Sequence, residues 1–285
     1  SREGNGDKIR RFKEAWSCVA AVVKDILLDR YRLLLSLTPD DFPCNQTFRL
    51  WLTDFAADGG LEAVFRNGTL SFGFIGLAEA VEVLTGEKYF LSAEGRAIAL
   101  DLLRHMRTVV DRYRQEENLN FTLLASSGEY ISGRLPAIDK ETFDHPAVRK
   151  GFYTNSFHVD VDSGLDPIRK LQIEGPFHAL ANGGCVTYVE FSSAPVGNTD
   201  AVAEVIQAGV DHGINYLGIN FPLDRCRDCG EQGTFDRCPA CNGENVHRIR
   251  RVSGYLEDLE FFTSGKQSEV ARRRPNAPAG PTGGR

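Results

Sequence analysis

Two Cys-x-x-Cys pairs constrain this chain more than any other feature of its sequence. They are Cys226 with Cys229 and Cys238 with Cys241, and eight residues separate the pairs. Two short turns would bring four thiolates to one tetrahedral ion, and four protein ligands leave no open position on that ion. The pattern therefore predicts a structural zinc site, which holds a small module together and does no chemistry itself.

Two other interpretations of these cysteines exist. Disulfides are typical of secreted chains, but the polar start, Ser-Arg-Glu-Gly-Asn-Gly, is not a signal peptide. Regularly paired cysteines in an intracellular chain favour a metal instead. An iron–sulfur cluster is compatible with the spacing of the four residues.

Length and composition limit the class of protein. With 285 residues, of which 42% are hydrophobic and 25% charged, the chain should form one large globular domain and a small appendage. A net charge of −6 argues against a general nucleic-acid or membrane-surface binder. Since no apolar run reaches transmembrane length, we expect a cytoplasmic protein. The single methionine, Met106, and the first residue, Ser1, suggest the C-terminal portion of a longer chain.

A glycine lies a dozen residues beyond the cysteines. Gly254 stands within the hexapeptide Arg-Val-Ser-Gly-Tyr-Leu, residues 251–256. Its simplest interpretation is a loop glycine chosen for a positive φ angle. Glycine is also suited to carry an unpaired electron on Cα, because it has no side chain to force that carbon out of plane and its flanking amides delocalise the electron. The residue alone leaves both interpretations open.

The hexapeptide resembles the fingerprint of the glycyl radical enzymes. Ser253 is as in the pyruvate formate-lyase branch, whereas Leu256 and the cysteine pairs resemble the anaerobic (class III) ribonucleoside-triphosphate reductases. The paired cysteines favour the reductases. Other segments similar to that family are residues 152–158, 181–190, 219–224 and 265–270, so the resemblance covers most of the chain and is strongest from about 120 to 274.

The resemblance implies an α/β fold, the C-terminal part of a ten-stranded barrel with a four-cysteine zinc module and a glycyl radical loop. Its implied divisions are a helix-rich and βα part of the catalytic barrel (1–222), the zinc-binding module (223–248), the glycyl radical loop (249–274) and a tail (275–285). The composition of the tail, rich in Pro, Ala and Gly, predicts disorder. The arginines before it, residues 272–274, are expected to be part of a solvated tail.

The resemblance also implies a reaction. A radical-SAM activating enzyme would generate a radical at Gly254, which is stored in a dry core and passed to a cysteine. The resulting thiyl radical would start the reduction of ribonucleoside triphosphates to deoxyribonucleoside triphosphates for DNA synthesis, with formate or a thiol system as reductant. The family's thiyl cysteine stands in a Cys-Arg context, which neither Cys18 nor Cys44 matches. We therefore expect that cysteine outside this chain, and we expect a homodimer with no membrane or direct nucleic-acid partner.

Candidate substrate contacts lie in residues 154–156. Thr154, Asn155 and Ser156 carry groups that hold sugar and phosphate oxygens, and their family counterparts lie close to substrate, although such a tripeptide is also a good turn or cap. His158 alternates with apolar neighbours on a predicted strand, which fits a structural histidine as well as a catalytic one.

Periodicity predicts helices and strands along the chain. The first is a long amphipathic helix from Ile9 to Leu37. A second helix should end at Gly86, and Ser92 should cap a third, whose arginines and His105 are expected to form a solvated face. The remaining predictions are a strand at 121–125 with a turn-rich loop to residue 134, a helix at 167–181, and a βαβ unit built from strand 185–191, helix 198–210 and strand 214–220. In the loop, Glu129 and Arg134 are either substrate contacts or a surface ion pair.

Two alternative functions remain at this point. The chain could be a radical-carrying subunit, or a spare glycyl radical module, of a split enzyme. It could also be a carbon–carbon lyase like pyruvate formate-lyase, although such lyases normally show adjacent catalytic cysteines and no metal knuckles.

Overall fold

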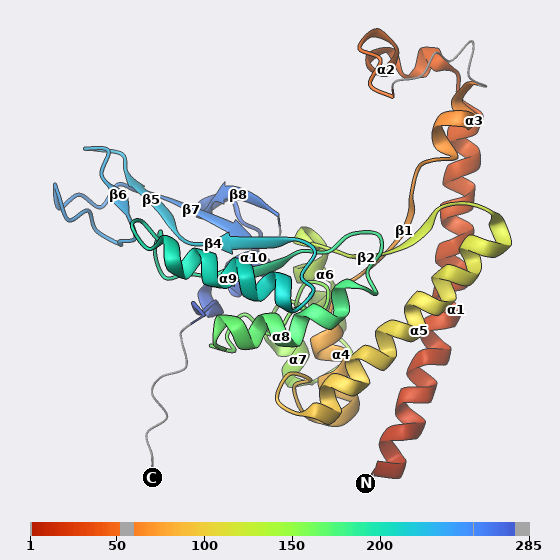
Figure 1. Cartoon of the computed structure of the whole chain (residues 1–285), viewed down its shortest axis with the longest axis horizontal. Helices are drawn as coiled ribbons and strands as arrows, with labels where there is room; N and C mark the ends of the chain where they lie inside the picture. Colours follow the sequence, from red (N-terminus) through yellow and green to blue (C-terminus); the bar gives the residue numbers. More distant parts are fainter. Residues whose placement is uncertain (1, 52–59, 253, 277–285) are drawn as a thin grey trace. The chain divides into compact units, whose positions relative to one another are not determined.

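The computed structural model describes residues 2–51, 60–252 and 254–276 (Figure 1). Its helices are α1 (Arg2–Leu35), α2 (Pro43–Thr47), α3 (Gly60–Phe65), α4 (Leu77–Thr85), α5 (Ala93–Glu117), α6 (Glu129–Asp139), α7 (Pro146–Arg149), α8 (Pro167–His178), α9 (Thr199–Asp211) and α10 (Ser264–Arg272), with 3₁₀ turns at Pro39–Asp41 and Leu259–Phe261. Its strands are β1 (Leu70–Phe74), β2 (Phe121–Ala125), β3 (Thr187–Glu190), β4 (Leu217–Asn220), β5 (Leu223–Cys226), β6 (Gln232–Gly233), β7 (Val246–Val252) and β8 (Tyr255–Asp258).

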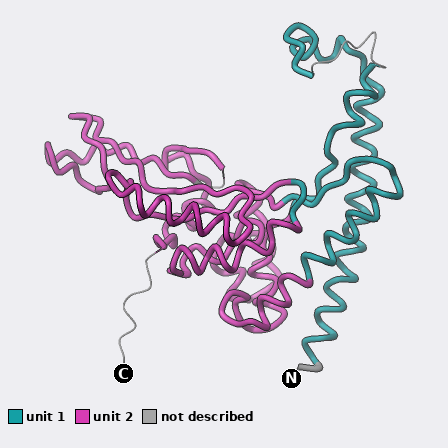
Figure 2. The backbone as a smooth tube through the Cα atoms, viewed as in Figure 1, with its two compact units in different colours: residues 1–73, 102–124, 181–183 teal, residues 74–101, 125–180, 184–285 magenta. Residues whose placement is uncertain are grey.

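The chain divides into two compact units, coloured separately in Figure 2. Unit one comprises residues 1–73, 102–124 and 181–183, and unit two comprises 74–101, 125–180 and 184–285. Among the described helices, none combines the length and apolarity needed to cross a membrane.

Unit one is built on two long helices. The predicted N-terminal helix is confirmed as α1, and the C-terminal part of α5 packs near it. His105 of α5 lies 2.9 Å from Ser17 Oγ and meets the Trp16 ring edge-on. The prediction that His105 belongs to a purely solvated face is therefore wrong. The predicted strand at 121–125 is confirmed as β2, which pairs with β1 and buries Phe121 against Phe72.

The predicted helix ends in unit two are confirmed. Gly86 follows α4 with φ of 84°, a left-handed conformation that glycine adopts without steric cost. Ser92 Oγ accepts a hydrogen bond from the Gly95 N–H at 2.9 Å, as an N-cap should. These local signals fix the two ends because each depends on a residue's own conformational preference.

The predicted βαβ unit is also confirmed. Strands β3 and β4 pair in parallel, with Val189 opposite Ile219, and α9 connects them. Helix α9 begins at Asn198, whose side chain accepts from the Ala201 N–H. The strands are buried by a cluster of apolar side chains from α8, β3 and α9: Leu171, Val189, Val205 and Ala208.

Two local predictions are wrong. The turn-rich segment expected to run as a loop to residue 134 is helical from Glu129, as α6. Its glycine has a packing role, since a Cβ on Gly133 would lie 2.8 Å from the Gly265 Cα on α10. His158 is not on a strand. It follows a turn at Ser156, where φ is 47°; the His158 N–H donates to the Asn155 carbonyl within that turn, and the Val159 N–H donates to the Glu174 side chain.

A second, antiparallel sheet carries the cysteines and the glycine. Its order is β6-β5-β7-β8, so the segments expected as separate zinc module and radical loop share one sheet. The domain boundaries drawn from the sequence stay predictions. Within the stretch predicted to be disordered, Asn276 is held by hydrogen bonds to Glu190 and Leu165, and residues 277–285 lie outside the described part.

Candidate active site and metal centre

The four paired cysteines converge at one end of the antiparallel sheet. Their Sγ atoms all lie within 4.8 Å of one another, and two of the Sγ pairs are 3.5 Å apart, Cys226 with Cys241 and Cys229 with Cys238. Zinc–sulfur bonds of about 2.3 Å in a tetrahedron put the sulfurs about 3.8 Å apart, so the site has room for one such ion. A disulfide requires about 2.05 Å, and all four thiols are free.

The thiols of the cluster differ in their pKa. The N–H of Cys229, with that of Asp228, donates to the Cys226 sulfur and lowers the pKa of that thiol to about 7, whereas the neighbouring thiols raise the pKa of Cys229 and raise that of Cys241 to about 12. Metal ligation needs the thiolate, so these donors favour the ligating form. Beside the cysteines, Arg250 of β7 forms an ion pair with the buried Asp224 of β5 and fastens the two strands together.

Gly254 stands at the turn of the β7–β8 hairpin. Val252 pairs with Tyr255, and Gly254 directly precedes Tyr255; Ser253 lies outside the described residues. Gly254 has φ of 153°, a conformation that side chains rarely adopt, and a Cβ built on it would lie 3.8 Å from Ser127 Oγ. The glycine is exposed in this chain, not enclosed in a dry core as the resemblance implied. Next to it, Glu129 and Glu257 raise the pKa of the Tyr255 hydroxyl to about 12.

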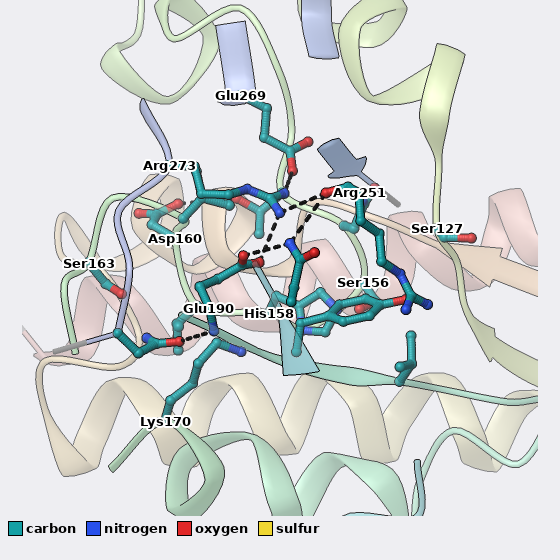
Figure 3. Close-up of a pocket in the computed structure, with 18 of the residues that line it drawn as sticks. Ser127, Ser156, His158, Asp160, Ser163, Lys170, Glu190, Arg251, Glu269 and Arg273 are labelled. Atoms are coloured by element: carbon teal, nitrogen blue, oxygen red, sulfur yellow. Dashed lines mark hydrogen bonds and ion pairs between the residues drawn. The ribbon is translucent and has the colours of Figure 1, made fainter. Parts of the chain in front are cut away.

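A polar pocket opens beside Ser127, the residue nearest the glycine (Figure 3). Its walls come from the β2–α6 loop, residues 154–163, the carboxyl ends of β3 and β4, and the segment that follows α10. All three predicted substrate residues, Thr154, Asn155 and Ser156, line it. Glu129 and Arg134 do not line it, and Arg134 instead contacts Tyr130.

Thr154 is engaged by a buried cluster of charges. Its Oγ1 donates to Glu79 Oε1 at 2.7 Å and lies 3.1 Å from Lys150 Nζ. Lys150 forms ion pairs with Glu79 and Asp160, and both carboxylates are nearly fully buried. The Thr154 hydroxyl is therefore used to hold the loop in place, which leaves Asn155 and Ser156 as the tripeptide's other candidates for contact with a ligand.

His158 lines the same pocket and is oriented from behind by a carboxylate. His158 Nδ1 lies 3.2 Å from Oε2 of the fully buried Glu174, and Lys170 Nζ lies 2.6 Å from Oε1. Burial alone would raise the pKa of Glu174, but Lys170 and His158 outweigh it and lower that pKa well below its usual value. An ionised Glu174 only accepts hydrogen bonds, so His158 Nδ1 carries the proton that they share.

Behind Glu174 a buried hydrogen-bond chain continues to a cysteine. The Asn215 N–H donates to His178 Nδ1 at 3.1 Å, so the proton of a neutral His178 is on Nε2, which donates to Thr187 Oγ1 at 2.9 Å. Thr187 in turn donates to Glu174 at 2.8 Å. Cys185 Sγ lies 3.1 Å from His178 Nδ1, and burial raises the pKa of this thiol to about 11. Cys185 is thus a protonated, half-buried thiol, while Cys18 and Cys44 are exposed.

The sequence interpretation missed the charged side of the pocket. The arginines at 272–274 were expected to be a solvated tail, but Arg273 is mostly buried between Glu190 and Glu269. Arg251 stacks over the Tyr188 ring, with its guanidinium carbon 4.5 Å from the ring centre. A signal did exist, since Lys266, Glu269 and Arg273 follow the three- and four-residue spacing of helical ion pairs.

The sequence comparisons identify the family. The sequence model of the family described as "Anaerobic ribonucleoside-triphosphate reductase" matches residues 3–275. The anaerobic ribonucleoside-triphosphate reductases of Salmonella typhimurium and Escherichia coli are each 35% identical to this chain over 233 residues, which is 76% of this chain and 32% of each relative. That of Haemophilus influenzae is 32% identical over 233 residues, 76% of this chain and 33% of its own length.

Solved structures share the fold. One anaerobic ribonucleotide reductase matches with a TM-score of 0.76 at 16% identity, over 96% of this chain and 42% of that chain. The Thermotoga maritima anaerobic ribonucleotide reductase, with dATP bound in its specificity site, matches with a TM-score of 0.68 at 16% identity, over 92% of this chain and 42% of that chain.

The family assignment depends on sequence, and the α/β fold agrees with it. The match covers nearly the whole chain, although the chain spans only about a third of the length of the curated relatives. The paired cysteines and the glycine hairpin lie inside the matched range. This chain belongs to the anaerobic ribonucleoside-triphosphate reductase family.

Proposed function

We propose that this chain is the radical-carrying part of an enzyme that reduces ribonucleoside triphosphates to 2′-deoxyribonucleoside triphosphates without oxygen. The observation that carries the proposal is the position of Gly254, at the tip of a hairpin anchored on four cysteines and next to Ser127 at a polar pocket. A radical source and a substrate pocket side by side are what this reaction needs.

Gly254 is the residue that loses a hydrogen atom in this proposal. A radical-SAM activating enzyme would remove the atom from Cα, and a φ of 153° favours glycine at this position for conformational reasons as well. Exposure of Gly254 gives such an enzyme access to it. Shielding from water would then come from the remainder of a ten-stranded barrel, which this chain would complete with β3 and β4.

The pocket would hold the substrate. Asn155, Ser156 and Ser127 offer uncharged hydrogen-bonding groups for sugar and phosphate oxygens, with His158 beside them. We assign the thiyl cysteine to sequence outside this chain, because neither Cys18 nor Cys44 stands in a Cys-Arg context and Cys185 is tied to His178. Formate or a thiol system would supply the reducing electrons, and we propose a cytoplasmic homodimer.

Zinc is the ion we propose for the four cysteines. Four thiolate ligands around one position match the preference of zinc and leave it no open site for chemistry. Cys226 ends β5, which pairs with β7, the strand that leads to Gly254. The ion would therefore fix the base of the hairpin and take no part in the reaction.

Electron paramagnetic resonance tests the proposal directly. The activated, oxygen-free, full-length protein should show a glycine-centred doublet that is absent from Gly254→Ala. Gly164→Ala is a matched control, because Gly164 also has a positive φ angle, 59°, and faces open space. That control should keep the doublet. A doublet that persists in Gly254→Ala would assign the radical to another residue.

A further inference from the structure

Arg273 contacts three separate elements of unit two. Its Nη1 donates to Glu190 Oε1 at 2.8 Å, and its Nη2 donates to Glu269 Oε1 at 2.6 Å. Nη1 also donates to the carbonyl oxygen of Arg251 at 3.1 Å. Since Glu190 ends β3, Glu269 belongs to α10 and Arg251 belongs to β7, one guanidinium joins all three (Figure 3).

A second donor reaches the same carbonyl. Asn220, at the end of β4, has its Nδ2 atom 2.6 Å from Glu190 Oε2 and 3.5 Å from the Arg251 carbonyl oxygen. We refer to Glu190, Asn220, Glu269 and Arg273 as the strand clamp. The strand clamp holds the backbone of β7 by hydrogen bonds to the Arg251 carbonyl, three residues before Gly254 and near the tip of the hairpin.

The charges of the clamp are balanced in a mostly buried setting. Glu269 is 4% exposed and Arg273 is 18% exposed. Burial alone would raise the pKa of Glu269, but Arg273 and Lys266 lower it. Lys266 Nζ lies 2.8 Å from Glu269 Oε2, so two cations face the two carboxylates of Glu190 and Glu269. Without Arg273, Lys266 would be the remaining cation of this pair beside Glu269.

The side chain of Arg251 is fixed as well as its carbonyl. Its guanidinium stacks on Tyr188 of β3 and donates to the Tyr188 hydroxyl at 2.7 Å. The planar guanidinium is rigid and always charged, so it suits both stacking and directed hydrogen bonds. Strand β7 thus reaches its turn with one residue held from two sides, and the next described residue after Val252 is Gly254 itself.

We propose that the strand clamp positions Gly254, with Arg273 as its central positioning residue. The clamp holds β7 so that the hairpin tip stays beside Ser127 and the pocket. The expected effect of the clamp on the glycyl radical rests on the function proposed above. The expected effect of the clamp on the hairpin does not. Arg273 touches neither Gly254 nor a reacting atom, so it acts only through the backbone of β7.

The test compares neighbouring arginines in the full-length protein. Arg273→Gln removes the charge, and Arg273→Lys keeps it but loses the planar fork. Arg272→Gln is the matched control, because Arg272 is 47% exposed and lies 3.4 Å from Asp162. Hydrogen exchange of the amides in residues 246–258 is measured before activation, and the glycine doublet is measured after it.

We expect Arg273→Gln to exchange these hairpin amides at least about tenfold faster than the parent protein, because the hairpin opens locally without global unfolding. The exchange rate in Arg273→Lys should fall between those of Arg273→Gln and the parent protein, and the rate in Arg272→Gln should match that of the parent. The yield or lifetime of the doublet should fall in the same order. If Arg273→Gln does not fold, as judged by circular dichroism, Glu190→Gln removes the opposing charge instead and should behave likewise.

Two outcomes would overturn the inference. One is equal exchange in the Arg273→Gln and Arg272→Gln proteins. The other is faster exchange with an unchanged doublet, which would make the clamp structural only. A parent protein that shows no doublet would instead refute the proposed function, and the exchange measurement would still decide whether Arg273 holds the hairpin.

Discussion

At the scale of single residues, burial and hydrogen bonding decide the state of each titratable group. Glu174 and His178 both lie in the core of unit two, yet Glu174 is ionised and His178 is neutral. Lys170 and His158 stabilise the charge on Glu174, whereas burial is the largest effect on His178 and lowers its pKa to about 4. Two neighbouring residues therefore respond to acid in different ways.

The lowered pKa of His178 predicts how the stability of the protein depends on pH. The pKa of a histidine in an unfolded chain is about 6.5, so unfolding takes up a proton at His178 between pH 6.5 and 4. Stability is fully present above this window and falls within it, by about 1.4 kcal/mol for each pH unit at most. The titratable groups that face His178 are those of Glu174, His158, Lys170 and Cys185. All the proteins compared contain these groups, so their own contributions to the pH dependence of stability are shared.

We expect His178→Gln to lose less unfolding free energy than the parent protein when the pH is lowered from 7 to 5. Urea unfolding at the two pH values measures the difference. His105→Gln is the control, because His105 belongs to unit one and its hydrogen-bond partners, Ser17 and Lys13, are not part of this chain of hydrogen bonds. A parent-like pH dependence in His178→Gln would contradict the prediction.

At the scale of elements, the antiparallel sheet connects the four cysteines to the glycine. Strand β5 supplies Cys226, β7 pairs with β5, and β8 returns from the Gly254 turn. The sheet is small, and its strands β6 and β8 are short, so an ion held by four sulfurs would supply much of its local stability.

The prediction at this scale concerns the effect of removing the proposed zinc ion. A chelator under reducing, oxygen-free conditions should release about one zinc per chain and accelerate hydrogen exchange in residues 223–258, with little change in α4. Cys229→Ser should lose the metal, and Cys44→Ser, a change at an exposed thiol outside the cluster, should keep it. Metal analysis that finds iron, or no metal, in the parent protein would refute the zinc assignment.

At the scale of the whole molecule, the chain spans about a third of the length of its curated relatives, and its pocket lies in unit two. Gly254 divides the sequence of unit two, because β8 and α10 come after it while β3 and β4 come before it. A break at that glycine would separate Arg273 from the strand that it holds.

The prediction at this scale concerns cleavage of the activated protein when it is exposed to air. Oxygen that reacts with a radical on a glycine Cα breaks the backbone there, so the activated full-length protein should be cut at Gly254. Tryptic digestion should yield a peptide that begins after Arg251 and stops at the break. Gly254→Ala and non-activated protein should both stay intact. Cleavage at any other glycine would place the radical elsewhere.

Local sequence by itself determined several of the helices, the βαβ unit and the cluster of four cysteines. Apolar spacing fixed α1, a glycine fixed the end of α4, and Ser92 fixed the start of α5, because each signal acts within about one helical turn. The cysteine spacing predicted a four-sulfur site, and the coordinates bring these sulfurs together. The resemblance to the reductase family was confirmed by the comparisons.

Only the tertiary structure decided which polar residues share a site. Glu190 and Arg273 meet although 83 positions separate them, and Thr154 meets Glu79 across 75. No local pattern encodes such distances, so Arg273 resembled part of a solvated run and Thr154 resembled a free ligand contact. The close approach of α6 to α10 at Gly133 is likewise a contact between segments far apart in the sequence. Short-range preferences specify the elements, but the pocket and the clamp exist only because packing closes long loops between them.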